Sequence, residues 1–260
     1  MPRLNHAEIQ TIAERILHDY DRAEPGTQFG EDLRLEIEDA WLVQDVVAQL
    51  RIDRGEKDVG YKIGCIVESN QQRMGLTHPA SGRLWASEIH EDCITLPKSE
   101  FANVALEAEF AVELSEDIEP GRTTDRDLLR AIKAIYPVIE IHNLVLRSEK
   151  PHGHELLANN AIHAGVVRGA AITEFDNELA TDLALIFDGQ TVDSWDSLHW
   201  PNDMLAAVNW LVERLAGKGN KLRAGELILT GAFGPPLPLG PGTKADVTSS
   251  AFGSVSAVFT

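Results

Sequence analysis

Apolar side chains follow a helical spacing at the start of the chain and a strand-like alternation further along. Asn5 followed by Glu8 forms a capping-box pattern, and the apolar residues after it recur every three or four positions as far as Tyr20. A second helix is predicted over residues 33–54, where a glycine follows the last apolar position. We therefore expect residues 1–57 to form a helical N-terminal part.

Short β-type runs separated by Gly, Pro and Asn replace this pattern over residues 58–260. The Asp-Gly pair at 188–189 predicts a two-residue hairpin between two of these runs. Two more helices are expected, one over 124–135 with Thr124 at its start and one over 201–216. We expect a β-rich domain that forms one continuous structural unit with the helical part. The predicted strands lie near residues 58–65, 104–114, 137–142, 182–187, 191–195, 225–230 and 254–259.

Composition excludes two classes of partner. The chain has 260 residues with 23 Lys and Arg against 41 Asp and Glu, which gives a net charge of −18. Nucleic acids and anionic membrane surfaces are recognised by clustered basic side chains, which this chain does not have in surplus. Cys65 and Cys93 are too few for a disulfide framework, and the first residues have no apolar stretch typical of a signal peptide. We expect a cytoplasmic protein without nucleic-acid or membrane partners.

Two glutamates share one face of the predicted strand over residues 104–114. Its side chains alternate strictly, with apolar residues on one face and with Glu107 and Glu109 on the other. Neighbouring side chains on one strand face lie ~6–7 Å apart, so these carboxylates need a cation or water between them. The alternative is an antiparallel strand whose polar face is exposed to solvent.

A third glutamate interrupts an apolar run. Glu140 lies between Ile139 and Ile141, and a carboxylate in such a place is costly unless it is paired or bound to a metal. Three carboxylates contributed by two strands form the oxygen set that Mg²⁺, Mn²⁺ or Ca²⁺ prefers. The pattern indicates a divalent cation site, with solvated carboxylates as the alternative.

Six segments of the chain occur in an order that resembles a known family. The order GYKIG, ALEAEFAVEL, VIEIHN, NNAIHAGVV, AGELILTG and FGSVSAVF is similar to the 2-keto-4-pentenoate hydratase and 4-oxalocrotonate decarboxylase family, within the fumarylacetoacetate hydrolase superfamily. The motifs span about residues 35–260. The resemblance implies an α+β fold with a rolled or barrel-like mixed sheet, peripheral helices and a helical N-terminal part. It also implies that the β-rich domain is catalytic.

The resemblance further implies an active site built around a divalent metal. Its motif positions assign Mg²⁺, with Mn²⁺ as the alternative, to Glu107, Glu109 and Glu140. Lys62 in GYKIG matches the family's active-site lysine, which would support an enolate or carry a proton. The alternative for Lys62 is an exposed position on an edge strand. The ILTG segment beside the ligand supplies the two remaining matches, Thr230 and Gly231.

The implied substrates are small 2-oxo or 2-hydroxy unsaturated carboxylic acids from the meta-cleavage of aromatic compounds. A divalent cation is a Lewis acid that stabilises the negative charge of an enolate, which serves hydration as well as decarboxylation. We expect a hydratase that converts a 2-hydroxyalka-2,4-dienoate to a 4-hydroxy-2-oxo acid. The alternatives are a decarboxylase of a 2-oxo-3-enedioate of the 4-oxalocrotonate type, a C–C hydrolase, and a weakly active partner subunit. The family also implies a homo-oligomer, which could bind a related decarboxylase or hydratase.

One motif departs from the pattern of the family's hydratases. These often read ADNASS, where this chain reads ANNAIH. Asn159 replaces the aspartate and so removes a candidate acid or base. Asn160 matches the asparagine, whereas Ile162 and His163 replace the two serines. Asn160 and His163 are therefore candidate catalytic groups, and the alternative for His163 is a histidine held in a strand by ordinary hydrogen bonds.

Three further residues are candidates close to the substrate. His154 and Glu155 belong to the stretch RSEKPHGHELL, which is expected to form a mobile loop. The family resemblance places this region near the active-site entrance and makes both residues candidate lid residues. Trp85 is a candidate wall of the pocket, with plain core packing as the alternative.

Overall fold

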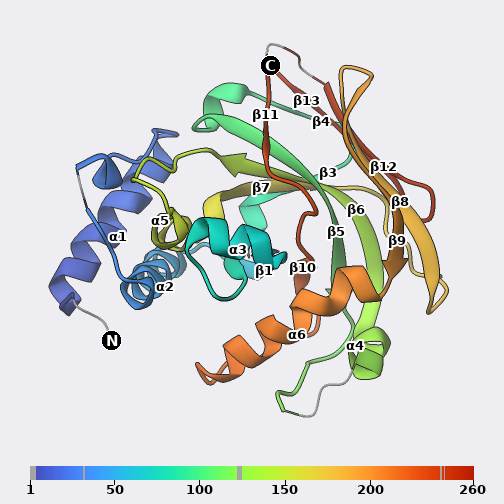
Figure 1. Cartoon of the computed structure of the whole chain (residues 1–260), viewed down its shortest axis with the longest axis horizontal. Helices are drawn as coiled ribbons and strands as arrows, with labels where there is room; N and C mark the ends of the chain where they lie inside the picture. The colour runs from blue at the N-terminus through green and yellow to red at the C-terminus, as the bar shows by residue number, and fades with distance from the viewer. Residues whose placement is uncertain (1–3, 32, 122–124, 241, 243) are drawn as a thin grey trace.

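The computed structural model describes residues 4–31, 33–121, 125–240, 242 and 244–260. Figure 1 shows a strongly curled sheet, a second sheet packed beside it, and two helices at the opposite end of the molecule. The helices of the described residues are α1 (His6–Asp21), α2 (Ile37–Asp53), α3 (Glu68–Met74), α4 (Asp125–Ala131), α5 (Gly153–Ala158) and α6 (Asn202–Ala216). None of them is long and apolar enough to cross a membrane.

The strands of the same residues form two sheets. The curled sheet has the order β2-β1-β10-β5-β6-β7-β3, with β11 pairing with β5, and the second sheet has the order β4-β13-β12-β8-β9. The residues Asp188 and Gly189 both have positive φ and close the predicted β8–β9 hairpin. The strand bounds are β1 (Asp58–Gly64), β2 (Ala80–Trp85), β3 (Ile89–Glu91), β4 (Ile94–Leu96), β5 (Val104–Leu114), β6 (Ile132–Asn143), β7 (His163–Arg168), β8 (Leu179–Phe187), β9 (Gln190–Trp200), β10 (Leu227–Leu229), β11 (Leu237–Pro238), β12 (Lys244–Ser249) and β13 (Gly253–Phe259).

One predicted helix is shorter than its periodicity suggests. α4 ends at Ala131, and β6 begins at Ile132, whereas the pattern predicts a helix through residue 135. The residues in question pair with the far end of β5, where Ile132 lies opposite Leu114, so sheet pairing outweighs local helical spacing. The predicted start at Thr124 lies outside the described residues.

The N-terminal helices pack on the β-rich part through buried contacts. Asn5 and Glu8 form the predicted capping box of α1. The apolar faces of α1 and α2 share one hydrophobic cluster with α5 and with the segment that follows β6. Gln44 of α2 ties these layers together, because its side-chain amide donates to the carbonyls of Ser81 and Leu157. The division into a helical part, residues 1–57, and a β-rich domain, residues 58–260, stays a prediction.

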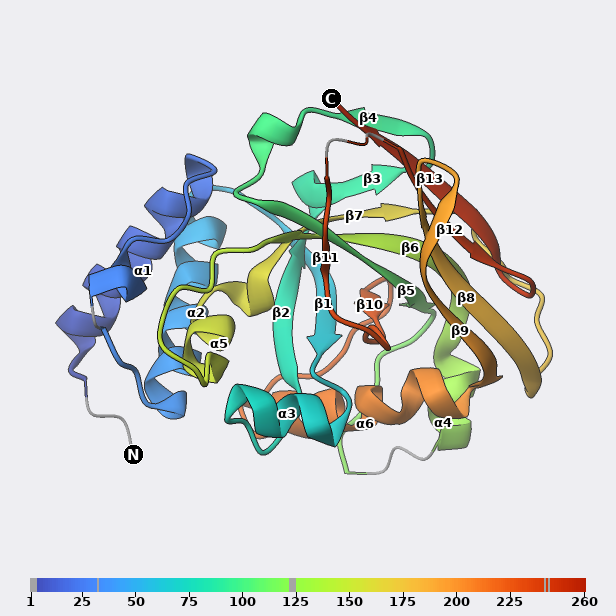
Figure 2. The ribbon, with the colours of Figure 1, turned by 45° about the horizontal axis from the view of Figure 1, so that its top comes forward.

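The two faces of the curled sheet have different surroundings. The outer face of β5, with Leu106, Ala108 and Phe110, belongs to the main hydrophobic core together with the second sheet and α6. The inner face carries a smaller apolar cluster that includes Val138 and Leu229. Figure 2 shows how far the sheet curls, since β1 and β2 run steeply across the direction of β6 and β7. The inner face is therefore enclosed rather than open to solvent.

Candidate metal centre

The register of β5 and β6 brings three glutamates together on the inner face of the curled sheet. Glu107 lies directly opposite Glu140, and Glu109 follows two residues further along β5 on the same face. Glu109 and Glu140 are 0% exposed and Glu107 is 9% exposed. The alternative of a solvent-exposed strand face is therefore wrong, and the carboxylates face one another.

A histidine outside the predicted ligand set joins these carboxylates. His142 lies two residues after Glu140 on β6, so its side chain shares the same face. Its Nε2 donates to Glu107 Oε2 at 2.9 Å and lies 3.3 Å from Glu140 Oε2. One ligand atom each of Glu107, Glu140 and His142 lies within 4.8 Å of the other two, which is close enough to hold a metal ion. The sequence could have indicated His142, because it follows Glu140 by two residues, the same spacing that places Glu107 and Glu109 on one strand face.

Burial and mutual charge shift the pKa values of these groups in different directions. Burial, together with the charges of Glu140 and Glu107, raises the pKa of Glu109 well above its usual value. Burial opposes the charge of Glu140, but His142 and Lys62 outweigh it and hold the pKa of Glu140 well below its usual value. Burial opposes the charge of His142 as well, yet Glu140 and Glu107 raise the pKa of His142 to about 9. The cluster therefore favours additional positive charge.

This donor set fits a divalent cation. Glu109 Oε2 accepts a hydrogen bond from the backbone N–H of Gly231 at 3.0 Å. Its other oxygen, Oε1, is buried and has no hydrogen-bond partner among the described residues. A buried carboxylate oxygen without a donor is costly, and a cation held between carboxylates removes that cost. Oxygen ligands of this kind are those that Mg²⁺, Mn²⁺ and Ca²⁺ prefer.

Lys62 reaches the same carboxylates from β1. Its Nζ lies 3.3 Å from Glu140 Oε1 and donates to the carbonyl of Ala161 at 3.4 Å, in a buried position. Burial opposes its charge, but Glu140, Glu107 and Glu109 outweigh that effect and raise the pKa of Lys62. β1 lies between β2 and β10, so the alternative of an exposed lysine on an edge strand is wrong.

His163 lies at the start of β7, behind Glu140. Its Nδ1 donates to Glu140 Oε1 at 2.7 Å. Its Nε2 is buried, has no hydrogen-bond partner in the part of the chain that is described, and lies 3.9 Å from Glu88 Oε2. Glu88 in turn accepts hydrogen bonds from Tyr20 and Arg51 of the N-terminal helices. His163 thus links a predicted metal ligand to the helical part of the protein.

The two residues of the ILTG match lie beside Glu109. Gly231 donates its backbone N–H to that carboxylate, and a Cβ at this position, where φ is +108°, would lie 2.5 Å from Ile66. Thr230 is buried, and both its hydroxyl and its backbone N–H donate to the carbonyl of Phe110, at 3.1 and 3.0 Å. These contacts support β5 behind the metal centre. Direct contact of Thr230 and Gly231 with substrate stays a prediction.

The asparagines of the ANNAIH segment are engaged with the backbone. Asn160 Oδ1 accepts from the N–H of Arg83 at 2.7 Å, and its Nδ2 donates to the carbonyl of the same residue at 2.9 Å. Asn159 Nδ2 donates to the carbonyl of Glu155 at 2.9 Å. Neither asparagine lines the pocket that holds Lys62 and Glu107. This geometry favours a structural role, and a catalytic role for Asn160 stays a prediction without support from its contacts.

The three remaining candidates also lie outside that pocket. Trp85 is buried and packs against the guanidinium of Arg51, 4.3 Å from the ring centroid. His154 contacts Phe29, with 5.9 Å between the ring centroids, in a separate surface groove. Glu155 is fully buried, and its carboxylate accepts two consecutive backbone N–H groups of the preceding loop. Glu155 therefore holds the loop at Arg147 and Ser148 in place, whereas the sequence predicted a mobile loop here.

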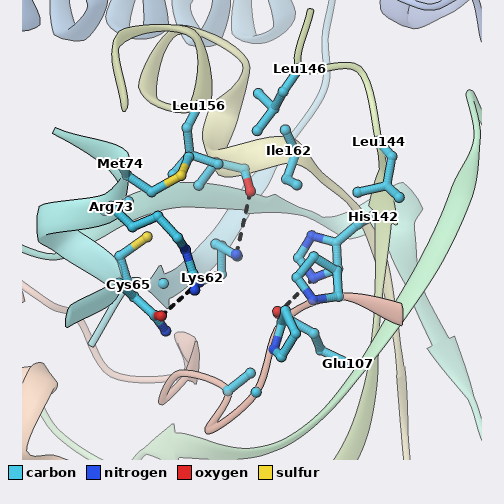
Figure 3. Close-up of a pocket in the computed structure, with 18 residues that line it drawn as sticks. Lys62, Cys65, Arg73, Met74, Glu107, His142, Leu144, Leu146, Leu156 and Ile162 are labelled. Atoms are coloured by element: carbon cyan, nitrogen blue, oxygen red, sulfur yellow. Dashed lines mark hydrogen bonds and ion pairs between the residues drawn. The ribbon is translucent and has the colours of Figure 1, made fainter. Parts of the chain in front are cut away.

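A pocket of about 170 Å³ opens beside the metal centre (Figure 3). Lys62, Glu107 and His142 line its polar end. Arg73 and Cys65 lie across the pocket from Glu107, and most of the remaining lining is apolar. The pocket can therefore take a small molecule that has a polar group at one end.

Known proteins are similar to this chain in sequence and in fold. A family model described as fumarylacetoacetate (FAA) hydrolase C-terminal matches residues 82–260. The chain belongs to the fumarylacetoacetate hydrolase family. The chain is 30% identical over 227 residues to a 2-keto-4-pentenoate hydratase of Paraburkholderia xenovorans (strain LB400), with 86% of this chain and 84% of the relative covered. It is 28% identical over 231 residues to a 2-oxo-hept-4-ene-1,7-dioate hydratase of Escherichia coli, with 86% of each chain covered.

Two solved structures share the fold of this chain. The structure of 4-oxalocrotonate decarboxylase from Pseudomonas putida G7, complexed with magnesium and adipate, matches with a TM-score of 0.86 over 100% of both chains at 24% sequence identity. A second structure of that decarboxylase, complexed with calcium and acetate, matches with a TM-score of 0.85. The predicted α+β fold and the predicted family are therefore confirmed.

Proposed function

We propose that this protein is a Mg²⁺-dependent hydro-lyase that converts a 2-hydroxyalka-2,4-dienoate to a 4-hydroxy-2-oxo acid. The observation that carries the proposal is the convergence of Glu107, Glu109 and Glu140 with Lys62 beside one pocket, whose polar end Lys62 and Glu107 line. The similarity to relatives named 2-keto-4-pentenoate hydratase, which extends over most of the chain, supports the reaction. Mn²⁺ is the alternative cation.

Each polar group has its own task in this proposal. Glu107, Glu109 and Glu140 would hold the Mg²⁺ ion, which supplies a Lewis acid for the enolate form of the substrate. Lys62 offers a buried positive charge at the same end of the pocket, where it can pair with an anionic oxygen or pass on a proton. His163 donates to Glu140 from behind and acts as a positioning residue.

The reaction is tested by incubating the purified protein with Mg²⁺ and 2-hydroxypenta-2,4-dienoate. We expect the conjugated absorbance to decay without release of CO₂, and chelation of Mg²⁺ to stop the decay. Lys62→Met should reduce kcat while Mg²⁺ remains bound. An unchanged kcat in this variant contradicts the role given to Lys62.

The metal centre is tested separately by Mg²⁺ binding in solution. Glu107→Gln and Glu140→Gln should each weaken Mg²⁺ binding at least tenfold, because each removes a charged oxygen ligand. Glu113→Gln is the matched control, since Glu113 lies on the same strand but pairs with Lys133 and Tyr136 instead. Equal affinities in all three variants contradict the assignment of the site.

Decarboxylation of a 2-oxo-3-enedioate is the second candidate function. The observation that favours it is the departure from the hydratase pattern at His163, whose ring contacts Glu140 directly. Release of CO₂ from 2-oxohex-3-enedioate, without turnover of the dienoate, would support this candidate. Turnover of neither compound would leave a C–C hydrolase or a weakly active partner subunit.

The setting of this activity is part of the same proposal. We expect a cytoplasmic homo-oligomer acting in the catabolism of aromatic compounds, which could associate with a related decarboxylase or hydratase. Light scattering of the purified protein measures its oligomeric state, and a monomer would contradict this expectation.

A further inference from the structure

Two buried polar atoms behind the metal centre face each other without a direct hydrogen bond. His163 Nε2 and Glu88 Oε2 lie 3.9 Å apart, and neither has a hydrogen-bond partner among the described residues. His163 is 1% exposed, and Glu88, the last residue of η2 (Ala86–Glu88), is 8% exposed. A buried polar atom without a partner costs free energy, so each of the two atoms needs a donor.

Both atoms are hydrogen-bond acceptors. The Nδ1–H of His163 is used on Glu140 Oε1, so Nε2 of the neutral ring presents a lone pair. Glu88 accepts from Tyr20 and Arg51 at Oε1, which leaves Oε2 facing the histidine. A charged ring that donated directly to this carboxylate would lie about 2.7–2.9 Å from it. Two acceptors that are 3.9 Å apart fit a molecule that donates one O–H to each, and water is such a molecule.

The surroundings offer room for one water molecule and hold Glu88 in place. A cavity of about 20 Å³ is lined by His163 and by Tyr20, the residue whose hydroxyl donates to Glu88. About 10–15 Å³ of such space is enough for one water molecule. On its other side Glu88 pairs with Arg51, whose guanidinium packs 4.3 Å from the ring centroid of Trp85. Glu88 therefore cannot close the gap to His163 without giving up these contacts.

We propose that a buried water molecule bridges Glu88 and His163, and that Glu88 is a positioning residue of the metal centre. Through this water Glu88 holds the ring of His163 in the orientation that donates to Glu140 Oε1, which leaves Glu140 Oε2 for the cation. Tyr20 of α1 and Arg51 of α2 hold Glu88, so the helical part of the chain supports metal binding without contacting the metal. The inference rests on the proposed function only for the presence of the metal.

A crystal structure of the wild-type protein at a resolution that shows ordered waters tests the bridge directly. We expect one water molecule within about 2.6–3.2 Å of both His163 Nε2 and Glu88 Oε2. Direct contact between the two side chains, or the absence of an ordered water between them, overturns the proposal. This test needs no variant, so it holds even if a change at Glu88 prevents folding.

Mg²⁺ binding measured by titration calorimetry tests the positioning role. Glu88→Leu removes the acceptor at similar size and should raise the Kd of Mg²⁺ about three- to tenfold, less than the loss of a group bonded directly to a ligand. Glu88→Gln keeps a polar group toward the water and should bring Kd back to within about twofold of the wild-type value.

Glu56→Leu is the matched control for these variants. Glu56 pairs with Arg51 as Glu88 does, whereas Glu88 is the partner that lies 3.9 Å from His163. The Kd of Mg²⁺ should therefore stay unchanged in Glu56→Leu. An unchanged Kd in Glu88→Leu, or an equal rise in Glu56→Leu, overturns the positioning role.

Combination with His163→Ser shows whether Glu88 acts through this histidine. In the His163→Ser background, Glu88→Leu should raise the Kd of Mg²⁺ by less than about twofold, because residues in one chain of contacts are not additive. The same rise in both backgrounds overturns the proposal.

Nitrogen-15 NMR of histidine-labelled protein adds a readout that a side chain with a merely stabilising role would not change. The chemical shift of the unprotonated His163 Nε2 depends on whether this atom accepts a hydrogen bond. We expect the shift to change in Glu88→Leu and to stay the same in Glu56→Leu. Identical shifts in the wild type and in Glu88→Leu contradict the bridge.

These measurements also separate the inference from the proposed reaction. If the dienoates are not hydrated but Glu88→Leu weakens Mg²⁺ binding only when His163 is present, the reaction is wrong and the positioning role stands. If the dienoates are hydrated but Mg²⁺ binding does not depend on Glu88, the reaction stands and the positioning role is wrong.

Discussion

Replacing Arg51 with methionine should destabilise the protein by about 3–5 kcal/mol, the usual result of removing one partner from a buried ion pair. Arg51 is 5% exposed, and its guanidinium forms ion pairs with Glu56 and Glu88. It also packs 4.3 Å from the ring centroid of Trp85 and 5.0 Å from that of Tyr20. Methionine keeps apolar contact with these rings, so the loss comes mainly from the buried carboxylate of Glu88, which is left without its cation.

Urea unfolding of the single and double variants measures this loss. Combining Arg51→Met with Glu88→Gln should recover at least about 2 kcal/mol relative to the sum of the single changes, because residues in one ion pair couple in a double-mutant cycle. Arg22→Met is the matched control, since its side chain is 58% exposed and pairs with Glu24 at the surface. This control should change the free energy of unfolding by less than about 1 kcal/mol.

Two results would refute the reasoning about Arg51. The first is a loss below about 1 kcal/mol in Arg51→Met, which is the range of an exposed ion pair. The second is strict additivity of Arg51→Met and Glu88→Gln, which would show that the two side chains do not stabilise each other.

Three further predictions concern burial and backbone contacts. Burial opposes the charge of Asp19, but the backbone N–H of Thr27 and neighbouring side chains outweigh this effect and lower the pKa of Asp19. Asp19→Asn should therefore reduce the free energy of unfolding by about 1–2 kcal/mol at pH 7. Urea unfolding should show this loss shrinking as the pH falls below 3.8, because the native carboxylate then becomes protonated. Glu155→Gln should cost about 1–3 kcal/mol and increase hydrogen exchange at residues 147–148, because their amides lose a charged acceptor. Gly60→Ala should prevent folding or lower the melting temperature strongly, since its Cβ would lie 1.8 Å from a carbonyl oxygen of β10, and an unchanged circular-dichroism melt would contradict this.

Strict alternation is the reason why β5 and its glutamates could be predicted from the sequence. Residues 104–114 alternate without interruption, and the structure has β5 with those bounds. β2 lacks such a signal because it contains Gly82, where a Cβ would lie 2.3 Å from the carbonyl oxygen of Asn160. Glycine is there for a close approach of two backbones that are far apart in sequence. Local patterns do not record that kind of requirement.

The motif resemblance brought together Glu107, Glu140 and Lys62, which do lie close to one another, but it also included Asn160 and Trp85, which do not line the pocket. Glu107 and Glu140 lie on the paired strands β5 and β6, and Lys62 lies on β1, which β10 separates from β5 in the same curled sheet. Each side chain therefore needs only the correct face of the sheet to reach the others. The side-chain directions of Asn160 and Trp85 depend instead on contacts with distant parts of the chain. Asn160 bonds to the backbone of Arg83, and Trp85 packs against Arg51 of α2, both outside the pocket. Spacing along the sequence does not determine such directions.

The two departures from the hydratase pattern differ in whether they reach the metal centre. The side chain of Asn159 donates to the backbone carbonyl of Glu155 and does not line the pocket, and its recorded hydrogen bond does not involve Glu107, Glu109 or Glu140. His163 and Lys62 both approach Glu140 Oε1, at 2.7 and 3.3 Å. A carboxylate oxygen has two lone pairs, so these two donors occupy Oε1 and leave Oε2, which faces His142, for a cation. The replacement of serine by His163 therefore fixes the orientation of Glu140, and it is the departure through which this chain can differ in chemistry from the hydratases it resembles.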